Sequence, residues 1–244
     1  ETFDKEYGLL QRFYAKYLEM RPTIITGWNV DGFDIPYLYN RAQQIVGKNI
    51  ADCLSPVSKV YWNKYREKYM IAGVSCLDYL MLYKNFTFSS KPSYRLDDIG
   101  QSEVGTSKIS YDGTLNDLYE NHLEDFVKYN IHDVRIVKKL DDKLDFIDVA
   151  RGICHVGHVP YEDIVYDSRF LEGAILVYLK KLGIVVPNKP PREDVKKDGT
   201  FTGAYVQDPQ KGRHDWVYDL DITSMYPSII MSLNISPETK IGKI

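Results

Sequence analysis

Cysteine is scarce in this sequence, and its scarcity excludes several classes of protein. The 244 residues include three cysteines, Cys53, Cys76 and Cys154, and none of them forms a CxxC pair. A small domain stapled by disulfides is therefore excluded, and a reducing compartment is favoured over a secreted location. The segment from Cys154 to His158 also carries two histidines. It lacks a second pair of metal ligands, so we interpret these histidines as core or surface residues rather than as a zinc site.

Long apolar runs and an excess of basic charge are absent as well. Apolar runs such as residues 174–179 are far shorter than the ~20 residues that a membrane span needs, so we expect no membrane partner. The chain has 31 basic and 34 acidic residues, a net charge of −3, so no global positive field indicates a nucleic-acid partner. A local basic groove beside clustered carboxylates stays compatible with this charge. With 44% hydrophobic and 13% aromatic residues, the composition is that of a globular protein.

Hydrophobic periodicity predicts an α/β first region. Strands followed by helices are typical of this class. The expected elements are a helix over 3–17 with Thr2 as a possible cap, a strand over 23–26, a strand-to-helix loop over 29–34, a helix from Pro36 to about 46, a polar, turn-rich stretch over 98–113, and a long helix over 115–144.

A proline cluster marks the best candidate boundary in the chain. Pro187, Pro190 and Pro191 are followed by a charged, turn-forming stretch over 192–199, after a helical pattern that Gly183 would cap. Beyond the boundary, apolar and polar residues alternate over 216–222, which predicts a strand. Two aspartates, Asp219 and Asp221, would then share one face of that strand.

Three aspartates stand at positions where phosphodiester chemistry could use them. Two-metal catalysis requires several carboxylates that converge on divalent ions ~3.5 to 4 Å apart. Asp34 lies at the entrance of a predicted helix, Asp133 lies inside one, and Asp221 ends a predicted strand. An aspartate at a helix entrance is more often a cap than a metal ligand, so none of the three is diagnostic without its neighbours.

The neighbours of these aspartates resemble motifs of family B DNA polymerases. Residues 29–34, Asn-Val-Asp-Gly-Phe-Asp, resemble the second exonuclease motif, and residues 129–133, Tyr-Asn-Ile-His-Asp, resemble the third. The i,i+4 spacing of the third puts its tyrosine and aspartate on one helix face. Residues 221–230, Asp-Ile-Thr-Ser-Met-Tyr-Pro-Ser-Ile-Ile, resemble polymerase motif A, with Met225 in place of the usual leucine. This exchange conserves volume.

The resemblance covers essentially the whole chain and implies a domain organisation. Residues 73–98 and 234–239 look most like the replicative polymerases of T-even-type bacteriophages. By this resemblance we expect an RNase H-like 3′→5′ exonuclease domain, a mixed sheet flanked by helices, over 1–145, without its N-terminal part. A connecting segment that belongs to the N-terminal domain would follow over 146–190, and the start of an α+β polymerase palm over 191–244.

The resemblance also implies two metal sites. Asp34 and Asp133 would be exonuclease metal ligands, and the phenol of Tyr129 would orient a metal-bound water. In the polymerase site, Asp221 would bind both ions, together with the backbone carbonyl of Ile222. Each site would use two Mg²⁺ ions, for which Mn²⁺ can substitute.

Several further residues receive binding roles from the resemblance. Ser224, Met225 and Tyr226 would bind the incoming deoxynucleoside triphosphate, with the Tyr226 ring excluding a 2′-hydroxyl. The role of Asp219 stays open between a third carboxylate near the site and a solvated edge residue, and we favour the second.

DNA contacts are expected from three places in the chain. Basic and aromatic residues interleave over 59–69, as on surfaces that bind single strands, and phage relatives use a hairpin here to separate primer from template. A solvated hairpin whose rings pack on the domain is the alternative. The expected DNA-binding residues are Asn29 and Phe33 of the second exonuclease motif, Tyr61, Trp62, Lys64 and Arg66 of the hairpin, and Phe201, Gly203 and Ala204 of an aromatic-x-Gly-Gly/Ala element.

The expected function is that of a segment of a DNA-directed DNA polymerase with a proofreading 3′→5′ exonuclease. By the resemblance, the first exonuclease motif, an Asp-x-Glu, and polymerase motifs B and C would lie outside these 244 residues, so we expect the fragment alone to be inactive. The alternative is a non-catalytic, DNA-binding piece of a replication assembly. Expected partners are primer–template and single-stranded DNA, deoxynucleoside triphosphates and, through the full-length protein, a sliding clamp and a single-strand-binding protein, in the cytoplasm of a phage host.

Overall fold

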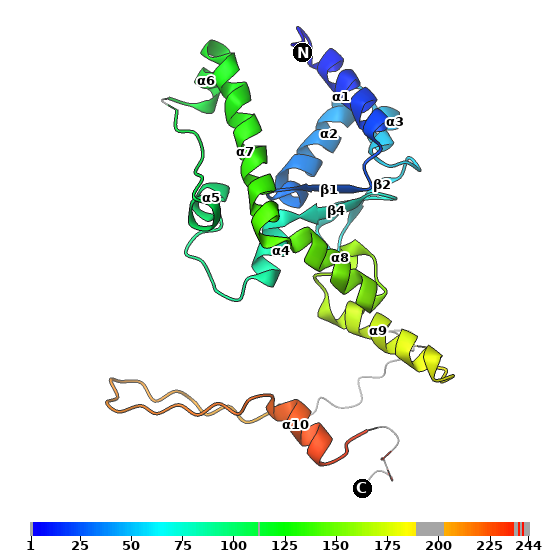
Figure 1. Ribbon diagram of the computed structural model, residues 1–244, viewed down its shortest axis with the longest axis vertical. Helices are drawn as coiled ribbons and strands as arrows, with labels where there is room; N and C mark the ends of the chain where they lie inside the picture. The colour runs from blue at the N-terminus through cyan, green and yellow to red at the C-terminus, as the bar shows by residue number, and fades with distance from the viewer. Residues whose placement is uncertain (1, 112, 189–202, 237–238, 240, 242–244) are drawn as a thin grey trace. The chain divides into compact units, whose positions relative to one another are not determined.

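The chain divides into two units, Glu1–Asn188 and Lys189–Ile244, here called the first and second units. Figure 1 shows the computed structural model, which describes residues 2–111, 113–188, 203–236, 239 and 241. None of the helices in this described part combines the length and apolarity needed to cross a bilayer.

The first unit contains most of the regular secondary structure. Its order is α1 (Glu6–Met20), β1 (Ile24–Gly27), a π-helical turn (Val30–Asp34), α2 (Ile35–Ile45), α3 (Lys48–Ala51), a 3₁₀ turn (Asp52–Leu54), β2 (Val60–Asn63), β3 (Lys68–Ile71), β4 (Ser75–Asp78), α4 (Tyr79–Phe86), α5 (Leu96–Val104), α6 (Leu115–Asn121), α7 (Leu123–Leu144), α8 (Phe146–Gly157), a second 3₁₀ turn (Tyr161–Asp163) and α9 (Asp167–Lys181). The second unit contributes α10 (Met225–Ser232).

Two small sheets organise the first unit. Strands β1 and β4 pair in parallel with Gly27 opposite Asp78, so both strands end at the same edge. Strands β2 and β3 form an antiparallel hairpin in which Val60 faces Ile71. The α/β class is thereby confirmed, and the sheets found in the described residues are two separate pairs.

Hydrophobic side chains pack on both faces of the β1–β4 pair. Because strand side chains alternate, Ile24 and Leu77 join one buried cluster while Ile25 and Cys76 join the other. The first cluster gathers residues of α4, α5, α7 and α8, and the second gathers residues of α1, α2 and the hairpin. In Figure 1 the long helix α7 lies beside α5. The β1–β4 pair therefore lies between two buried clusters.

Most local predictions for the first unit are confirmed, with differences at element ends. Helix α1 begins at Glu6 after Lys5, so Thr2 is not its cap. The expected long helix over 115–144 is broken at His122 into α6 and α7. Gly183 follows α9 with φ +71°, as expected of a residue that ends a helix.

Three stretches differ from the sequence-based prediction. Residues 98–113 are not all turns, because α5 runs through Val104 and buries Leu96 and Ile99. The residues before Asp34 wind into a π-helical turn rather than an irregular loop. No strand forms over 216–222 in the part of the second unit that the structure describes, where the alternating side chains find no partner strand and Trp216 has φ +58°.

Candidate functional site

The second exonuclease-like motif forms a tight turn between β1 and α2. Asn29 adopts a left-handed conformation with φ +63°, and its carbonyl accepts a hydrogen bond from Phe33 N at 3.0 Å. A Cβ on Gly32 would lie 2.6 Å from Asn29 Oδ1, so glycine leaves room for the amide. The turn closes with a bond from Ile35 N to the Val30 carbonyl and delivers Asp34 to the start of α2.

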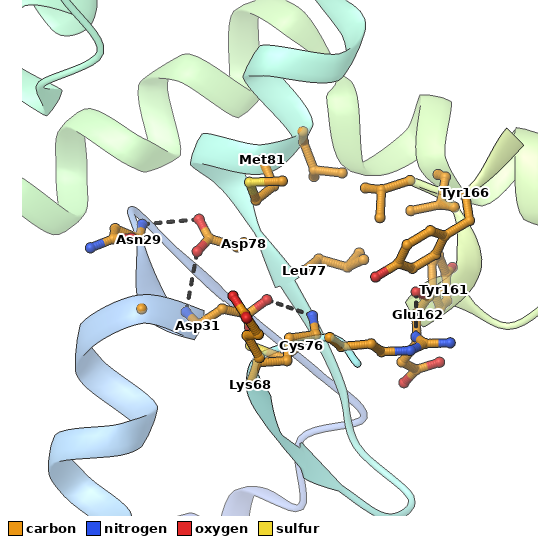
Figure 2. A pocket seen from close by; sticks show the side chains of 16 residues that line it. Asn29, Asp31, Lys68, Cys76, Leu77, Asp78, Met81, Tyr161, Glu162 and Tyr166 are labelled. Atoms are coloured by element: carbon orange, nitrogen blue, oxygen red, sulfur yellow. Dashed lines mark hydrogen bonds and ion pairs between the residues drawn. The ribbon is translucent and has the colours of Figure 1, made fainter. Parts of the chain in front are cut away.

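Asp78 fixes this turn from the neighbouring strand. Its carboxylate accepts hydrogen bonds from Asn29 N at 2.9 Å and Asp31 N at 3.2 Å, as Figure 2 shows, and from Leu80 N at 3.0 Å. The residue is 4% exposed. Desolvation raises its pKa, and the backbone bonds from Asp31, Asn29 and Leu80 partly offset this effect. Asp78 therefore serves as the end of β4, the cap of α4 and the anchor of the motif.

A cavity of about 270 Å³ borders the turn. Asp31 and Lys68 form an ion pair of 2.5 Å at its wall, and burial raises the pKa of the neighbouring Cys76 thiol. Figure 2 shows Leu77 and Met81 on the apolar side of the cavity and Tyr166 across from Asp78. The lining does not include Asp34, Tyr129 or Asp133, so the cavity is not the place where the predicted exonuclease residues meet.

The third exonuclease-like motif is organised by a lysine. Lys108 Nζ donates to Asp133 Oδ2 at 2.7 Å and to Tyr129 OH at 3.1 Å, and it lies 5.3 Å from the centre of the Tyr129 ring. Because Tyr129 and Asp133 are four residues apart on α7, one ammonium group reaches both. Desolvation lowers the pKa of Lys108, but the hydrogen bonds to Asp133 and Tyr129 outweigh it, so the net pKa is raised.

The carboxylates of Asp133 and Asp34 are the candidate metal ligands of the two exonuclease-like motifs. Asp133 Oδ1 is buried and has no hydrogen-bond partner, as expected of an oxygen built to meet a cation. Asp34 is exposed as a whole residue, yet the pKa of its carboxyl is raised. Desolvation raises this pKa more than the hydrogen bond from the residue's own backbone N–H lowers it. Nowhere in the described ranges do three His, Cys, Asp or Glu side chains gather closely enough to hold a metal ion. The carboxylates fit a divalent cation chemically, but the described residues supply only part of a ligand set.

The hairpin presents aromatic rings to solvent. Tyr61 and Trp62 are 44% and 48% exposed, Lys59 Nζ lies 5.6 Å from the Tyr61 ring centre, and Lys64 is exposed in the turn. Trp62 also packs edge-on against Tyr69 at 5.2 Å. The ring of Trp62 thus packs on a residue of the hairpin itself, and single-strand binding by this surface stays a prediction.

Arg66 differs from the other hairpin residues. Its guanidinium donates to the Glu162 carbonyl at 2.7 Å, pairs with Asp163 and lies 5.1 Å from the Tyr166 ring centre. These contacts tie the hairpin turn to the segment before α9. DNA binding by Arg66 stays a prediction, and it would require the side chain to share or leave these partners.

In the second unit, the motif A residues lie around the start of α10. Asp221 and Ile222 precede the helix in an exposed segment without regular structure, and Ser224 has φ +52°. Met225 and Tyr226 open the helix and are 40% and 67% exposed. Gly203 and Ala204 are exposed and irregular, and Phe201 lies outside the described residues. Asp219 is exposed, and its role remains open.

Sequence reasoning missed Asp78 and Lys108. Asp78 ends a four-residue strand that shows no alternation, and Lys108 stands in a stretch interpreted as turns. The one local signal for Asp78 was the helical pattern that follows it, since aspartate is a favoured helix cap. Nothing near Lys108 in sequence announces a partner 25 residues away.

Comparison with known proteins gives matches over most of the chain. Residues 1–99 match the exonuclease domain of DNA polymerase family B, and residues 165–243 match the family B DNA polymerase model. The chain is 37% identical over 247 residues to a DNA-directed DNA polymerase of Enterobacteria phage T4, covering 99% of this chain and 27% of that protein.

Two further relatives extend the comparison. The DNA-directed DNA polymerase of Escherichia phage RB69 is 37% identical, with 98% of this chain and 27% of the relative covered. DNA polymerase 1 of Pyrococcus abyssi is 25% identical, with 98% of this chain and 31% of the relative covered. The chain thus spans about a quarter to a third of the length of these relatives. With both domain models matched and the phage polymerases similar along nearly its whole length, this chain belongs to DNA polymerase family B.

Proposed function

We propose that this chain acts within a DNA-directed DNA polymerase that also proofreads with a 3′→5′ exonuclease. The observation that carries the proposal is Asp133, which has one carboxylate oxygen on Lys108 and the other buried without a partner, on the helix face it shares with Tyr129. The ion pair with Lys108 satisfies only one of the two carboxylate oxygens, and the other is free to bind a cation. The family and the names of the phage relatives agree with this function.

In the exonuclease site, Asp34 and Asp133 would hold Mg²⁺, or Mn²⁺ in its place. The ions would supply an activated water and stabilisation of the leaving oxygen. The residues of the chain have separate tasks. The phenol of Tyr129 would orient the attacking water, and Lys108 holds the Asp133 carboxylate in place by donating a hydrogen bond to its Oδ2. Asn29 and Phe33 contact the terminal nucleotide, since the exposed Phe33 ring, stacked on Tyr37, offers a face to a base.

In the polymerase site, Asp221 and the Ile222 carbonyl would hold the two ions. Ser224, Met225 and Tyr226 open α10, where the first backbone N–H groups have no partner within the helix and favour phosphate oxygens. The Tyr226 ring would lie under the sugar and exclude a 2′-hydroxyl by contact.

The proposal includes the finer architecture expected from the sequence. The first region would be an RNase H-like exonuclease domain over 1–145, followed by a connecting segment over 146–190 and the start of the palm over 191–244. Primer–template DNA, single-stranded DNA and deoxynucleoside triphosphates would be its substrates. A sliding clamp and a single-strand-binding protein would act on the complete polymerase in the cytoplasm of the host cell.

The hairpin would guide single-stranded DNA towards the exonuclease site. Tyr61, Trp62 and Lys64 offer two rings and a cation to bases and phosphates. Gly203 and Ala204 would contact DNA, together with Phe201. The same exposed hairpin favours the second candidate, a DNA-binding piece of a replication assembly that contributes contacts but no catalysis.

Substitution of the carboxylates distinguishes the two candidates. In a polymerase completed at both ends of this segment, Asp34→Ala and Asp133→Ala should each lower single-strand degradation at least a hundredfold while primer extension stays near wild type. Tyr129→Phe should have a smaller effect, because it removes only the hydroxyl that orients water. Asp142→Ala is the matched control, since Asp142 lies on the same helix and pairs at the surface with Lys138. Undiminished degradation by both alanine variants would leave the non-catalytic candidate.

A further inference from the structure

We propose that Asp97 and His132 are positioning residues that hold Lys108 against Tyr129 and Asp133. The proposal rests on the exonuclease site proposed above. Lys108 lies in the 106–108 segment, which follows α5 and belongs to no helix or strand. Because a lysine has a long, flexible side chain, the place of its ammonium depends on how firmly its backbone is fixed.

Asp97 fixes the backbone of Lys108 directly. Its Oδ1 accepts a hydrogen bond from Lys108 N at 2.6 Å, although the two residues are 11 positions apart. Asp97 stands in the first turn of α5, a helix whose Leu96 and Ile99 are buried in the core. A hydrogen bond with an ionised acceptor is stronger than a neutral one, so this contact connects the lysine to a rigid helix.

His132 fixes the same segment from α7. The Ser107 carbonyl accepts from the His132 ring, with Nε2 at 2.9 Å. His132 directly precedes Asp133, so one residue of α7 holds the segment and the next receives its lysine. Further along α7, Lys139 Nζ donates to Thr106 Oγ1 at 3.1 Å. Each residue of the 106–108 segment therefore has its own partner.

The turn at Gly105 brings the 106–108 segment close to α7. Gly105 adopts φ +61°, and Thr106 N donates to the Gly100 carbonyl at 3.2 Å, which reverses the chain after α5. A Cβ on Gly100 would lie 2.6 Å from the Thr106 carbonyl oxygen and 2.8 Å from Ile136 Cγ2. The two glycines thus let the segment pass between α5 and α7 at close range.

The geometry predicts which step the positioning residues affect. Without Asp97, the Lys108 backbone would lose its fixed place, and the ammonium would no longer reach Asp133 and Tyr129 together. The carboxylate would lose its cationic partner and the phenol its donor. Since neither Asp97 nor His132 belongs to the DNA-contacting set, turnover should fall while DNA binding stays.

The first test measures backbone hydrogen exchange in the 244-residue chain. Asp97→Ala should speed exchange of the Lys108 amide at least tenfold, whereas Asp97→Asn, which keeps an acceptor oxygen, should stay within about threefold of wild type. Core amides of α7 such as Ile136 should not change in either variant. The matched control is Asp98→Ala, because Asp98 accepts from Ser93 and does not touch the segment. Unchanged exchange at Lys108 in Asp97→Ala, or equal acceleration in Asp98→Ala, would overturn the proposal.

The second test measures degradation of single-stranded DNA by a polymerase completed around this segment. Asp97→Ala and His132→Ala should lower kcat at least tenfold with KM unchanged, and Asp97→Asn should restore most of the rate. A rise in KM at constant kcat would overturn the positioning role. Lys108→Ala separates the two proposals, because wild-type degradation by that variant would refute the proposed exonuclease role of the cluster, while the exchange measurement still decides whether Asp97 holds Lys108.

Discussion

The two units differ in the relation between sequence motif and structural support. In the first unit the exonuclease-like motifs are short, yet residues outside them hold them in place. Asp78 accepts a hydrogen bond from Asn29 of the second motif, and Lys108 donates one to Asp133 of the third. In the second unit the motif A segment is much longer, yet Asp221 and Tyr226 are exposed and no hydrogen bond of their side chains is found among the described residues.

In this chain, the length of a motif therefore does not set how many hydrogen bonds hold its residues. A motif that binds a substrate needs residue types in a fixed order, and these residues can stay exposed until the substrate arrives. A motif whose side chains are held by segments distant in the sequence needs fewer residues, because those distant segments fix the positions of its side chains.

The largest effect should come from the acid pair of the second unit. In a completed polymerase, Asp221→Asn should slow nucleotide addition by about a thousandfold or more, because its carboxylate would bridge both ions. Asp219→Asn should slow it by less than about tenfold. Single-turnover primer extension measures both rates. Equal losses would show that the second unit uses a wider carboxylate cluster than its motif indicates.

The next effect concerns stability. Leu140 is fully buried in the core of the first unit, so Leu140→Ala should lower its free energy of unfolding by about 2–5 kcal/mol. Ile229 of α10 is 43% exposed, and Ile229→Ala should change the stability of the chain by less than about 1 kcal/mol. Urea titrations followed by circular dichroism check both values. A large loss in Ile229→Ala would mean that the Ile229 side chain packs in a core.

Acid should weaken the first unit through Glu103. Its carboxylate accepts from Tyr83 OH at 2.7 Å and Lys91 Nζ at 3.0 Å, and these bonds, with a further one from Lys143, hold its pKa at about 2. A lowered pKa contributes stability above the unfolded value of about 4.5, and this contribution is lost as pH falls towards 2.

Glu103→Gln should therefore cost roughly 1–3 kcal/mol at pH 7 and much less at pH 2. Unfolding measured at both pH values checks the sign. Asp142→Asn serves as a surface control, because its partner Lys138 is largely solvated. A Glu103→Gln penalty that does not change with pH would refute the ionic origin of this stabilisation.

The smallest effect tests the exposed tyrosine of α10. Tyr226→Ala in a completed polymerase should raise ribonucleotide incorporation relative to deoxyribonucleotide by at least about tenfold, since the ring proposed to exclude the 2′-hydroxyl would be removed. Tyr226→Phe keeps the ring and should keep the selectivity. Comparison of primer-extension rates with the two kinds of nucleotide measures the ratio. An unchanged ratio in the alanine variant would assign the exclusion to another residue.

Local periodicity predicted the elements that depend on local sequence. Helix α1, strand β1 and the start of α2 at Pro36 agree with the expected ranges within a few residues. Strand β4 escaped prediction because its four residues owe their conformation to β1, which lies about 50 positions earlier. Helix α5 escaped because Leu96 and Ile99 are its only large buried side chains.

The candidate site likewise has features that follow from local sequence and features that depend on distant segments. The i,i+4 relation of Tyr129 and Asp133 was predictable, since it depends only on helix geometry. The contacts of Asp78 with Asn29 and of Lys108 with Asp133 were not, because each joins segments far apart in sequence. The opposite case is the 216–222 stretch, whose alternation indicates a strand although the described residues offer it no partner.

The π-helical turn before α2 restricts how its motif can vary. A π turn holds one residue more per hydrogen-bonded loop than an α turn, and successive residues of a helix are rotated by about 100°. Loss of one residue between Asn29 and Asp34 would therefore leave α2 intact, but it would turn the Asp34 carboxylate to a different side of the helix axis. Related chains should accept substitutions within this turn far more readily than changes in its length. Alignments that allow a gap there would equate aspartates that point in different directions.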